Sequence, residues 1–192
     1  MRNFLILFDD IPIDGASVKS GNNSPEVITA ARCVNVGLFI SGNLRRDVVV
    51  TLAKGTPDDL KLISFPGANL KRVSPDERSI SFFLLKAISI ADGLLMDSLE
   101  TMDNGIEVRR STLTQFFEST NPTRVCISTP GNISSIIDIV DTEKSLLVYP
   151  IGKQFDSLQV DTKWKQMEVP HFQHPERFIL DINMIVDTKK AS

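Results

Sequence analysis

Short apolar runs alternate with amphipathic helical segments along this chain, and that alternation restricts its fold more than any other feature. Apolar runs typical of buried strands occupy residues 4–8, 48–52, 60–65, 125–128 and 146–151, and a further short strand is expected over 105–110. Apolar residues recur at helical spacing within residues 24–42, 74–88, 112–118 and 175–188. Strands separated by helices predict an α/β fold whose sheet is mostly parallel and flanked by helices.

Local signals place the ends of several elements. Ser24 followed by Pro25 is a typical helix start, with the serine as N-cap and the proline at the first helical position. Ser74 and Glu77 match a capping box, so a second helix is expected to begin at Ser74. Residues 10–24 are rich in Gly, Asn, Ser and Asp without periodicity, and we interpret them as a loop.

Composition excludes several classes of protein. The chain has 192 residues, 42% of them hydrophobic, which argues against disorder and suits a single domain over residues 1–192. Its net charge of −3 argues against a uniformly basic nucleic-acid coat protein. The apolar start ends at Asp9 without a cleavage site, and Lys86 interrupts the most apolar later stretch, so neither a signal peptide nor a membrane span is expected. With only Cys33 and Cys126, a disulfide framework is excluded and a cytoplasmic location is expected.

Known catalytic motifs are missing from the sequence. It contains no nucleophile elbow, P-loop, dinucleotide fingerprint or zinc pattern. Cys33 and Cys126 fall in apolar segments and are interpreted as small hydrophobic residues rather than nucleophiles. His171 and His174 stand three residues apart without a clear third ligand, so a solvated or packed pair is favoured over a metal site.

Basic residues gather in three places along the chain. Arg45, Arg46 and Asp47 precede a strand, five of the eight residues from 71 to 78 are charged around a helix start, and Arg109 and Arg110 end a strand. Arginine forks suit phosphate, and a helix N-terminus with flanking cations is a natural phosphate site. Solvated surface ion pairs and ordinary helix capping explain the same residues, so both interpretations stay open at this point.

Three strings stand in order along the chain: LRRDVV at 44–49, KRVSPDER at 71–78 and GIEVRR at 105–110. Together they resemble the archaeal tRNA pseudouridine N1-methyltransferases, a branch of the knotted SPOUT methyltransferases. The resemblance implies a SPOUT-type α/β fold with a C-terminal trefoil knot, a homodimer, and S-adenosylmethionine (SAM) bound by loops of the knot. It also implies methyl transfer to N1 of a pseudouridine in the T-loop of tRNA, at position 54, with neither DNA nor membrane as a partner.

The same resemblance implies roles for individual residues. Asp47 is the candidate for taking up the N1 proton or fixing the base. The candidate contacts to the flipped-out nucleotide and its phosphates are Arg45, Arg46, Arg78, Arg109 and Arg110. The candidate cofactor contacts are Ile127, Gly152, the loop residues Met167, Glu168, Val169 and Pro170, and Phe178.

The predicted cofactor site departs from the family pattern in three places. Glu168 stands where the family has an apolar residue, Phe178 stands where it has a cysteine, and residues 152–156 read GKQFD where the family has a Gly-Asp-His-Ile-Gly run. Two alternatives to the tRNA methyltransferase therefore stay open. One is a knotted paralogue with a degenerate cofactor site that binds RNA or acts in assembly, and the other is an enzyme that methylates a pseudouridine of another RNA.

Overall fold

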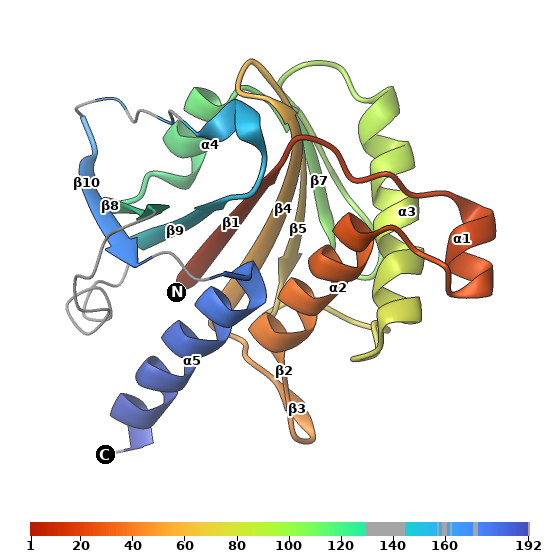
Figure 1. The fold of residues 1–192 in the computed structure, drawn as a ribbon, viewed down its shortest axis with the longest axis horizontal. Helices are drawn as coiled ribbons and strands as arrows, with labels where there is room; N and C mark the ends of the chain where they lie inside the picture. The colour runs from red at the N-terminus through yellow and green to blue at the C-terminus, as the bar shows by residue number, and fades with distance from the viewer. Residues whose placement is uncertain (130–144, 157, 159–160, 162, 171–172, 192) are drawn as a thin grey trace.

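One eight-stranded mixed sheet organises the molecule, as a computed structural model shows (Figure 1). The structure describes residues 1–129, 145–156, 158, 161, 163–170 and 173–191. The strands are β1 (Arg2–Phe8), β4 (Val48–Thr56), β5 (Asp59–Pro66), β6 (Ser98–Thr101), β7 (Glu107–Ser111), β8 (Arg124–Thr129), β9 (Ser145–Pro150) and β10 (Lys165–Pro170), with the separate hairpin β2 (Phe39–Ile40) and β3 (Asn43–Leu44). The helices are α1 (Gly15–Ser20), α2 (Pro25–Leu38), α3 (Glu77–Gly93), α4 (Leu113–Thr120) and α5 (Pro175–Ala191).

The order of strands across the sheet is β10-β8-β9-β1-β4-β5-β7-β6. The four neighbouring pairs from β10 to β4 are parallel, whereas β4–β5, β5–β7 and β7–β6 are antiparallel. The predicted α/β class with a mostly parallel sheet is confirmed. The β4–β5 pair is antiparallel because β4 turns directly into β5, without the long crossover, usually a helix, that a parallel pair requires.

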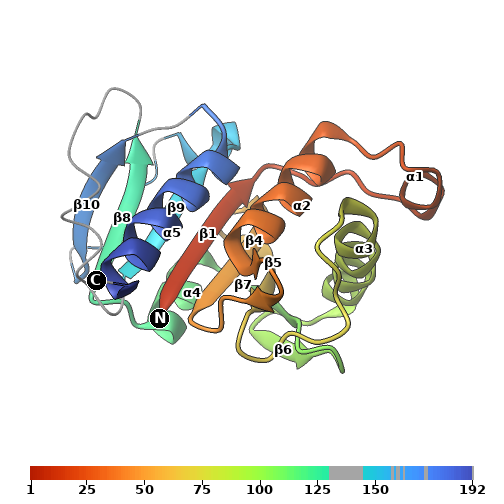
Figure 2. The same cartoon turned by 90° about the horizontal axis from the view of Figure 1, so that it is seen from below.

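Two layers of helices cover the two faces of this sheet. Figure 2 shows α2, α3 and α5 side by side on one face, and α4 lies on the other. Along β1, Phe4, Ile6 and Phe8 pack in the core under α2, α3 and α5, whereas Leu5 and Leu7 pack in the core on the α4 side. This alternation explains why β1 is an unbroken apolar run, because both of its faces are buried.

Several local predictions are wrong. The segment read as a loop contains α1, which begins at Asp14, whose carboxylate accepts hydrogen bonds from the backbone N–H groups of Ala16 and Ser17. The helix expected to start at Ser74 begins two residues later, because Asp76 is the N-cap and accepts from the Ser79 N–H at 2.8 Å. The expected loop Met167–Pro170 is part of β10, an edge strand paired with β8. The helix start at Ser24 and Pro25 is confirmed.

The trefoil knot stays a prediction, since its threading depends partly on residues 130–144, which lie outside the described part of the chain. Within the described residues, no helix is long and apolar enough to cross a membrane.

Candidate functional site

A pocket of about 860 Å³ opens where the parallel strands β8, β9 and β10 end. In an open α/β sheet, ligands usually bind at the carboxyl ends of the strands. The lining comes from these strand ends, from the segment after β9, and from α2 and the start of α5. The described lining residues are Thr29, Ile127, Ser128, Thr129, Tyr149, Pro150, Ile151, Phe155, Asp156, Leu158, Gln166, Glu168, Gln173, His174 and Pro175.

The predicted cofactor residues of β10 lie on two opposite faces of the strand. Glu168 lines the pocket together with Gln166, and Glu168 is opposite Ile127 of β8, which also lines it. Met167 and Val169 pack instead in the core that α2 and α5 cover. Because successive side chains of a strand point to opposite faces, the string Met167–Pro170 does not face the pocket as a unit. Pro170 ends the strand.

Gly152 and Phe178 shape the pocket from outside its lining. A Cβ atom at position 152 would collide with Asp9, whose carboxylate accepts the N–H groups of Lys153 and Gln154 at 3.0 and 3.1 Å. The glycine therefore lets Asp9 hold the turn that follows β9. Phe178 is fully buried, with its ring centroid 6.2 Å from that of Phe4 and 5.6 Å from that of Tyr149. It fills the core beneath the pocket wall.

Other lining residues were not singled out by the sequence. Burial raises the pKa of Tyr149 to about 12, so its hydroxyl stays protonated at neutral pH and serves as a hydrogen-bond donor rather than a base. Its position at the end of an apolar strand was the only sequence signal for this residue. His174 lines the pocket, whereas His171 lies outside the described residues. No group of three or more potential metal ligands occurs in the described part of the chain.

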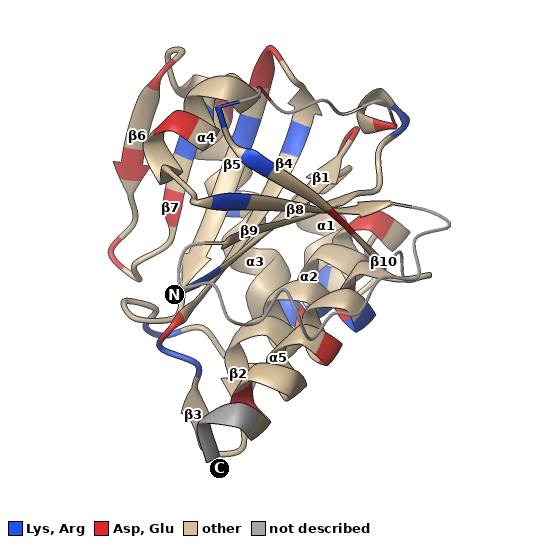
Figure 3. Ribbon diagram, turned by 90° about the vertical axis from the view of Figure 1, so that its left-hand side faces the viewer, with Lys and Arg blue, Asp and Glu red and all other residues tan. Residues whose placement is uncertain are grey.

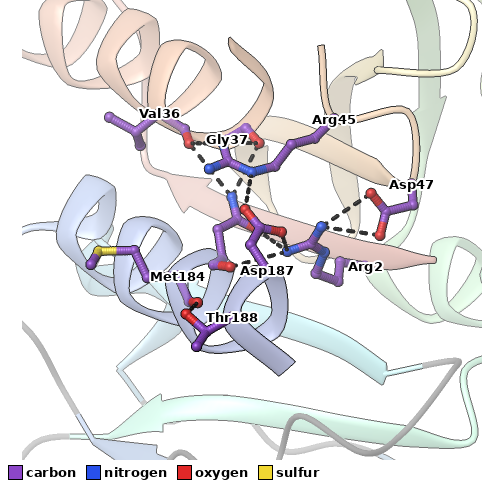
Figure 4. A network of polar contacts seen from close by, with 9 residues as sticks. Arg2, Val36, Gly37, Arg45, Asp47, Met184, Asp187 and Thr188 are labelled. Carbon is purple, nitrogen blue, oxygen red and sulfur yellow. Dashed lines mark hydrogen bonds and ion pairs between the residues drawn. The ribbon is translucent and has the colours of Figure 1, made fainter. Parts of the chain in front are cut away.

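Asp47 lies at the opposite end of the strands, just before β4 begins in the middle of the sheet. The Nη2 atom of Arg2 is 3.0 Å from both of its carboxylate oxygens, and the Nη1 atom of Arg2 donates to Asp187 of α5 at 3.0 Å (Figure 4). Arg45 donates from Nε to the same Asp187 at 2.8 Å and from Nη1 to the carbonyl of Val36 at 3.1 Å. The side chains of Arg2 and Arg45 are about one-tenth exposed, whereas those of Asp47 and Asp187 are 39% exposed, so two buried cations hold two partly exposed carboxylates.

The other arginines predicted to contact RNA differ in whether their side chains are already bound within the chain. Arg46 is exposed, and among the described residues its side chain donates to the carbonyls of Gly67 and Ala68. Arg110 makes a two-pronged ion pair with Asp59, with both N–O distances 2.8 Å, and this pair holds the pKa of Asp59 below its ordinary value. The side chains of exposed Arg78 and half-buried Arg109 make no hydrogen bond or ion pair within the described residues.

The pocket and Asp47 are therefore far apart within one chain. Val48 pairs with Arg2 at the first residue of β1, whereas Pro150, which lines the pocket, pairs with Leu7 near its other end. The seven residues of β1 span roughly 20 Å at the usual rise per residue. A single chain does not bring Asp47 to a ligand in its own pocket.

Seen from the β10 side, ribbon segments with Lys or Arg and segments with Asp or Glu are both spread over the molecule (Figure 3). Cys33 and Cys126 are buried, and burial raises the pKa of Cys126 to about 11 and that of Cys33 well above its ordinary value. This confirms that neither thiol is an activated nucleophile.

Comparisons with known proteins agree with this geometry. The profile of a family of SAM-dependent RNA methyltransferases matches residues 1–143. The tRNA (pseudouridine(54)-N(1))-methyltransferase of Natronomonas pharaonis is 25% identical over 161 residues, covering 83% of this chain and 80% of that protein. The enzyme of the same name from Methanocaldococcus jannaschii is 40% identical over 83 residues, covering 41% and 40% of the two chains. The crystal structure of Archaeoglobus fulgidus Nep1 bound to S-adenosylhomocysteine (SAH) aligns over 98% of both chains, with a TM-score of 0.57 and 11% identity.

Proposed function

The chain belongs to the family of SAM-dependent RNA methyltransferases, and from this premise we propose that it methylates N1 of pseudouridine 54 in the T-loop of tRNA. The observation that carries the proposal is the pocket at the carboxyl ends of β8, β9 and β10, in a chain whose relatives bear the name of this reaction.

The residues of the pocket fit SAM. Its volume of about 860 Å³ lies in the usual range for sites that bind small molecules and cofactors. Ile127, Tyr149 and Phe155 offer apolar and aromatic surface for an adenine ring, and Ser128 and Thr129 offer hydroxyl groups for polar atoms. Gly152 and Asp9 fix the turn that borders this space.

The proposed reaction requires removal of a proton from the base. Bound SAM supplies an electrophilic methyl group on a sulfonium sulfur. As the new N1–methyl bond forms, the N1–H proton has to leave, and a well-placed carboxylate accelerates such a step by about a hundredfold or more. We assign this role to Asp47, whose side chain is 39% exposed and whose carboxylate Arg2 holds in a fixed orientation.

Contacts to the RNA backbone are proposed for the arginines. Arg46, Arg78 and Arg109 are exposed or lack an internal ion-pair partner among the described residues, so they are available to phosphates. Arg45 and Arg110 were predicted to act in the same way, but each already binds a carboxylate of this chain. To contact a phosphate, Arg45 or Arg110 has to bind it together with its internal carboxylate or in place of that carboxylate.

A homodimer reconciles the positions of Asp47 and the pocket. The pocket lies at the N-terminal ends of α2 and α5, and the Asp47 network lies at their C-terminal ends. A two-fold axis perpendicular to these helices places the pocket of one copy beside Asp47 of the other. Ile40 and Met184, 43% and 57% exposed near these helix ends, offer apolar surface for such contact.

The test is methylation of a tRNA transcript carrying pseudouridine at position 54, followed by mass spectrometry of its nucleosides. We expect N1-methylpseudouridine with this substrate and none with uridine at the same position. A methyl group at another position would reject the T-loop assignment. A folded protein that binds tRNA without methylating it would favour the paralogue that has lost its cofactor site.

A further inference from the structure

The described lining of the pocket is acidic. It contains the carboxylates of Asp156 and Glu168, and none of its described members is a lysine or an arginine. Both acidic residues are exposed, and neither side chain has a hydrogen bond or ion pair with another described residue. Two carboxylates that pair with no described residue therefore face the space in which the cofactor is proposed to lie.

SAM and SAH differ by one methyl group and one positive charge. Both carry an α-ammonium and a carboxylate, but only SAM has a sulfonium, so SAM has a net charge of +1 and SAH a net charge of zero at neutral pH. All other interactions of the two ligands with the pocket are shared. Their relative affinity therefore reports the electrostatic environment of the pocket.

We infer that Glu168, assisted by Asp156, makes the pocket selective for the positively charged cofactor over its neutral product. This inference rests on the proposed assignment of the pocket to SAM. A sphere of 860 Å³ is about 12 Å across. Any ligand charge in the pocket therefore lies within about one Debye length of both carboxylates. The selectivity thus follows from the charge of the lining and requires no particular pose.

The proposed selectivity accounts for the glutamate at position 168, where the family has an apolar residue. An apolar residue there, as in the resembling family, contributes no charge, whereas Glu168 attracts the sulfonium in every orientation of the ligand. Methyl transfer removes that attraction, since the sulfur becomes a neutral thioether. The pocket then holds the product less tightly than the cofactor, which favours exchange of SAH for SAM.

The experiment measures the dissociation constants of SAM and SAH by isothermal titration to the full-length chain, its Glu168→Gln variant and a matched control. Glu100→Gln is the control, because Glu100 is an exposed acidic residue on β6, at the other edge of the sheet. We expect Glu168→Gln to reduce the preference for SAM over SAH by about fivefold, mainly by weakening SAM. Glu100→Gln should leave the preference unchanged.

Adding Asp156→Asn to Glu168→Gln should reduce the preference further, and raising the salt concentration should reduce that of the wild-type chain. An unchanged ratio in Glu168→Gln, with both ligands bound, overturns this inference and leaves the proposed function standing. A wild-type chain that binds neither ligand overturns both. Because the substitution is isosteric and exposed, circular dichroism should show the variant folded.

Discussion

Asp47 is held by a neighbour that the sequence around it does not reveal. Its partner Arg2 is 45 residues away, and Arg2 is fixed in turn by Asp187 and by the side-chain oxygen of Asn183 at 2.9 Å. The bridge sets the direction of the carboxylate while leaving 39% of the side chain exposed. A carboxylate oriented in this way is suited to accept a proton from a base presented from outside the chain.

Replacing Asp47 by Asn should reduce turnover by about a hundredfold, because an amide does not take up the N1 proton. The affinity for SAM should stay within about twofold of wild type, since Asp47 does not line the pocket and Asn keeps the size of its side chain. Single-turnover methylation and isothermal titration separate the two effects. Wild-type turnover in Asp47→Asn would remove this residue from the mechanism.

Neither cysteine should react in the folded protein. Burial raises the pKa of Cys126 to about 11 and that of Cys33 well above its ordinary value, so at pH 8 both thiols stay protonated and shielded from solvent. Intact-mass measurement after iodoacetamide treatment should show no adduct in buffer and two in concentrated urea. Rapid alkylation of either thiol in buffer would contradict the burial of the helix or strand that carries it.

At the scale of elements, the start of α3 shows how one local pattern allows two structures. Ser74 and Glu77 satisfy the capping-box spacing, yet Asp76 caps the helix, and the Ser74 N–H instead donates to the hydroxyl of Ser79 at 3.0 Å. The Glu77 carboxylate is drawn away from the cap, since it accepts a hydrogen bond from Asn23 at 2.9 Å. A contact with a distant loop thus overrides the local motif.

Asp76→Ala should therefore lower the free energy of unfolding by about 1 kcal/mol, the usual cost of losing an N-cap. Ser74→Ala, the matched substitution two residues earlier, should change it by less than about 0.5 kcal/mol because its hydroxyl caps nothing. Urea unfolding of both variants measures the difference. The reverse order of effects would place the cap at Ser74.

The strand β10 shows a different limit of local pattern. Its sequence, KQMEVP, mixes charged and apolar residues and has no clear strand signal. It becomes a strand because it pairs with β8 over six residues, and the alternation of pocket and core side chains follows from that pairing. This segment is brought beside β8 across 35 residues of intervening chain.

At the scale of the whole molecule, the sheet places the proposed cofactor pocket and the proposed base at opposite ends of its strands. The cofactor pocket lies at the carboxyl ends of β8, β9 and β10, and Asp47 lies at the amino end of β4. If the working site combines the pocket of one copy with Asp47 of another, then its two halves are supplied by different chains of the proposed homodimer.

Mixing two inactive variants tests this arrangement. Asp47→Asn keeps the pocket, and Gln166→Trp keeps Asp47 but fills the space of the cofactor with an indole ring. Random pairing on co-expression makes half of the dimers mixed, and each mixed dimer has one site with both halves intact. Recovered activity should approach about one quarter of wild type, as measured by methylation of tRNA.

Each variant expressed alone should stay near background, and this is the control for the mixture. If the reaction instead used Asp47 and the pocket of the same chain, no chain in the mixture would be intact. Activity in the mixture would then remain at background, which would reject the composite site.

The sequence by itself determined the α/β class, most of the strands and helices, the family and its basic strings. These features depend on local periodicity and on short motifs, which record what each segment buries or exposes. The tertiary structure alone decided that Arg45 and Arg110 bind internal carboxylates, that Glu168 but not Met167 or Val169 faces the pocket, and that Asp47 lies far from it. Such relations arise between residues as distant as Arg2 and Asp187, 185 positions apart, and depend on how the whole sheet is ordered and packed.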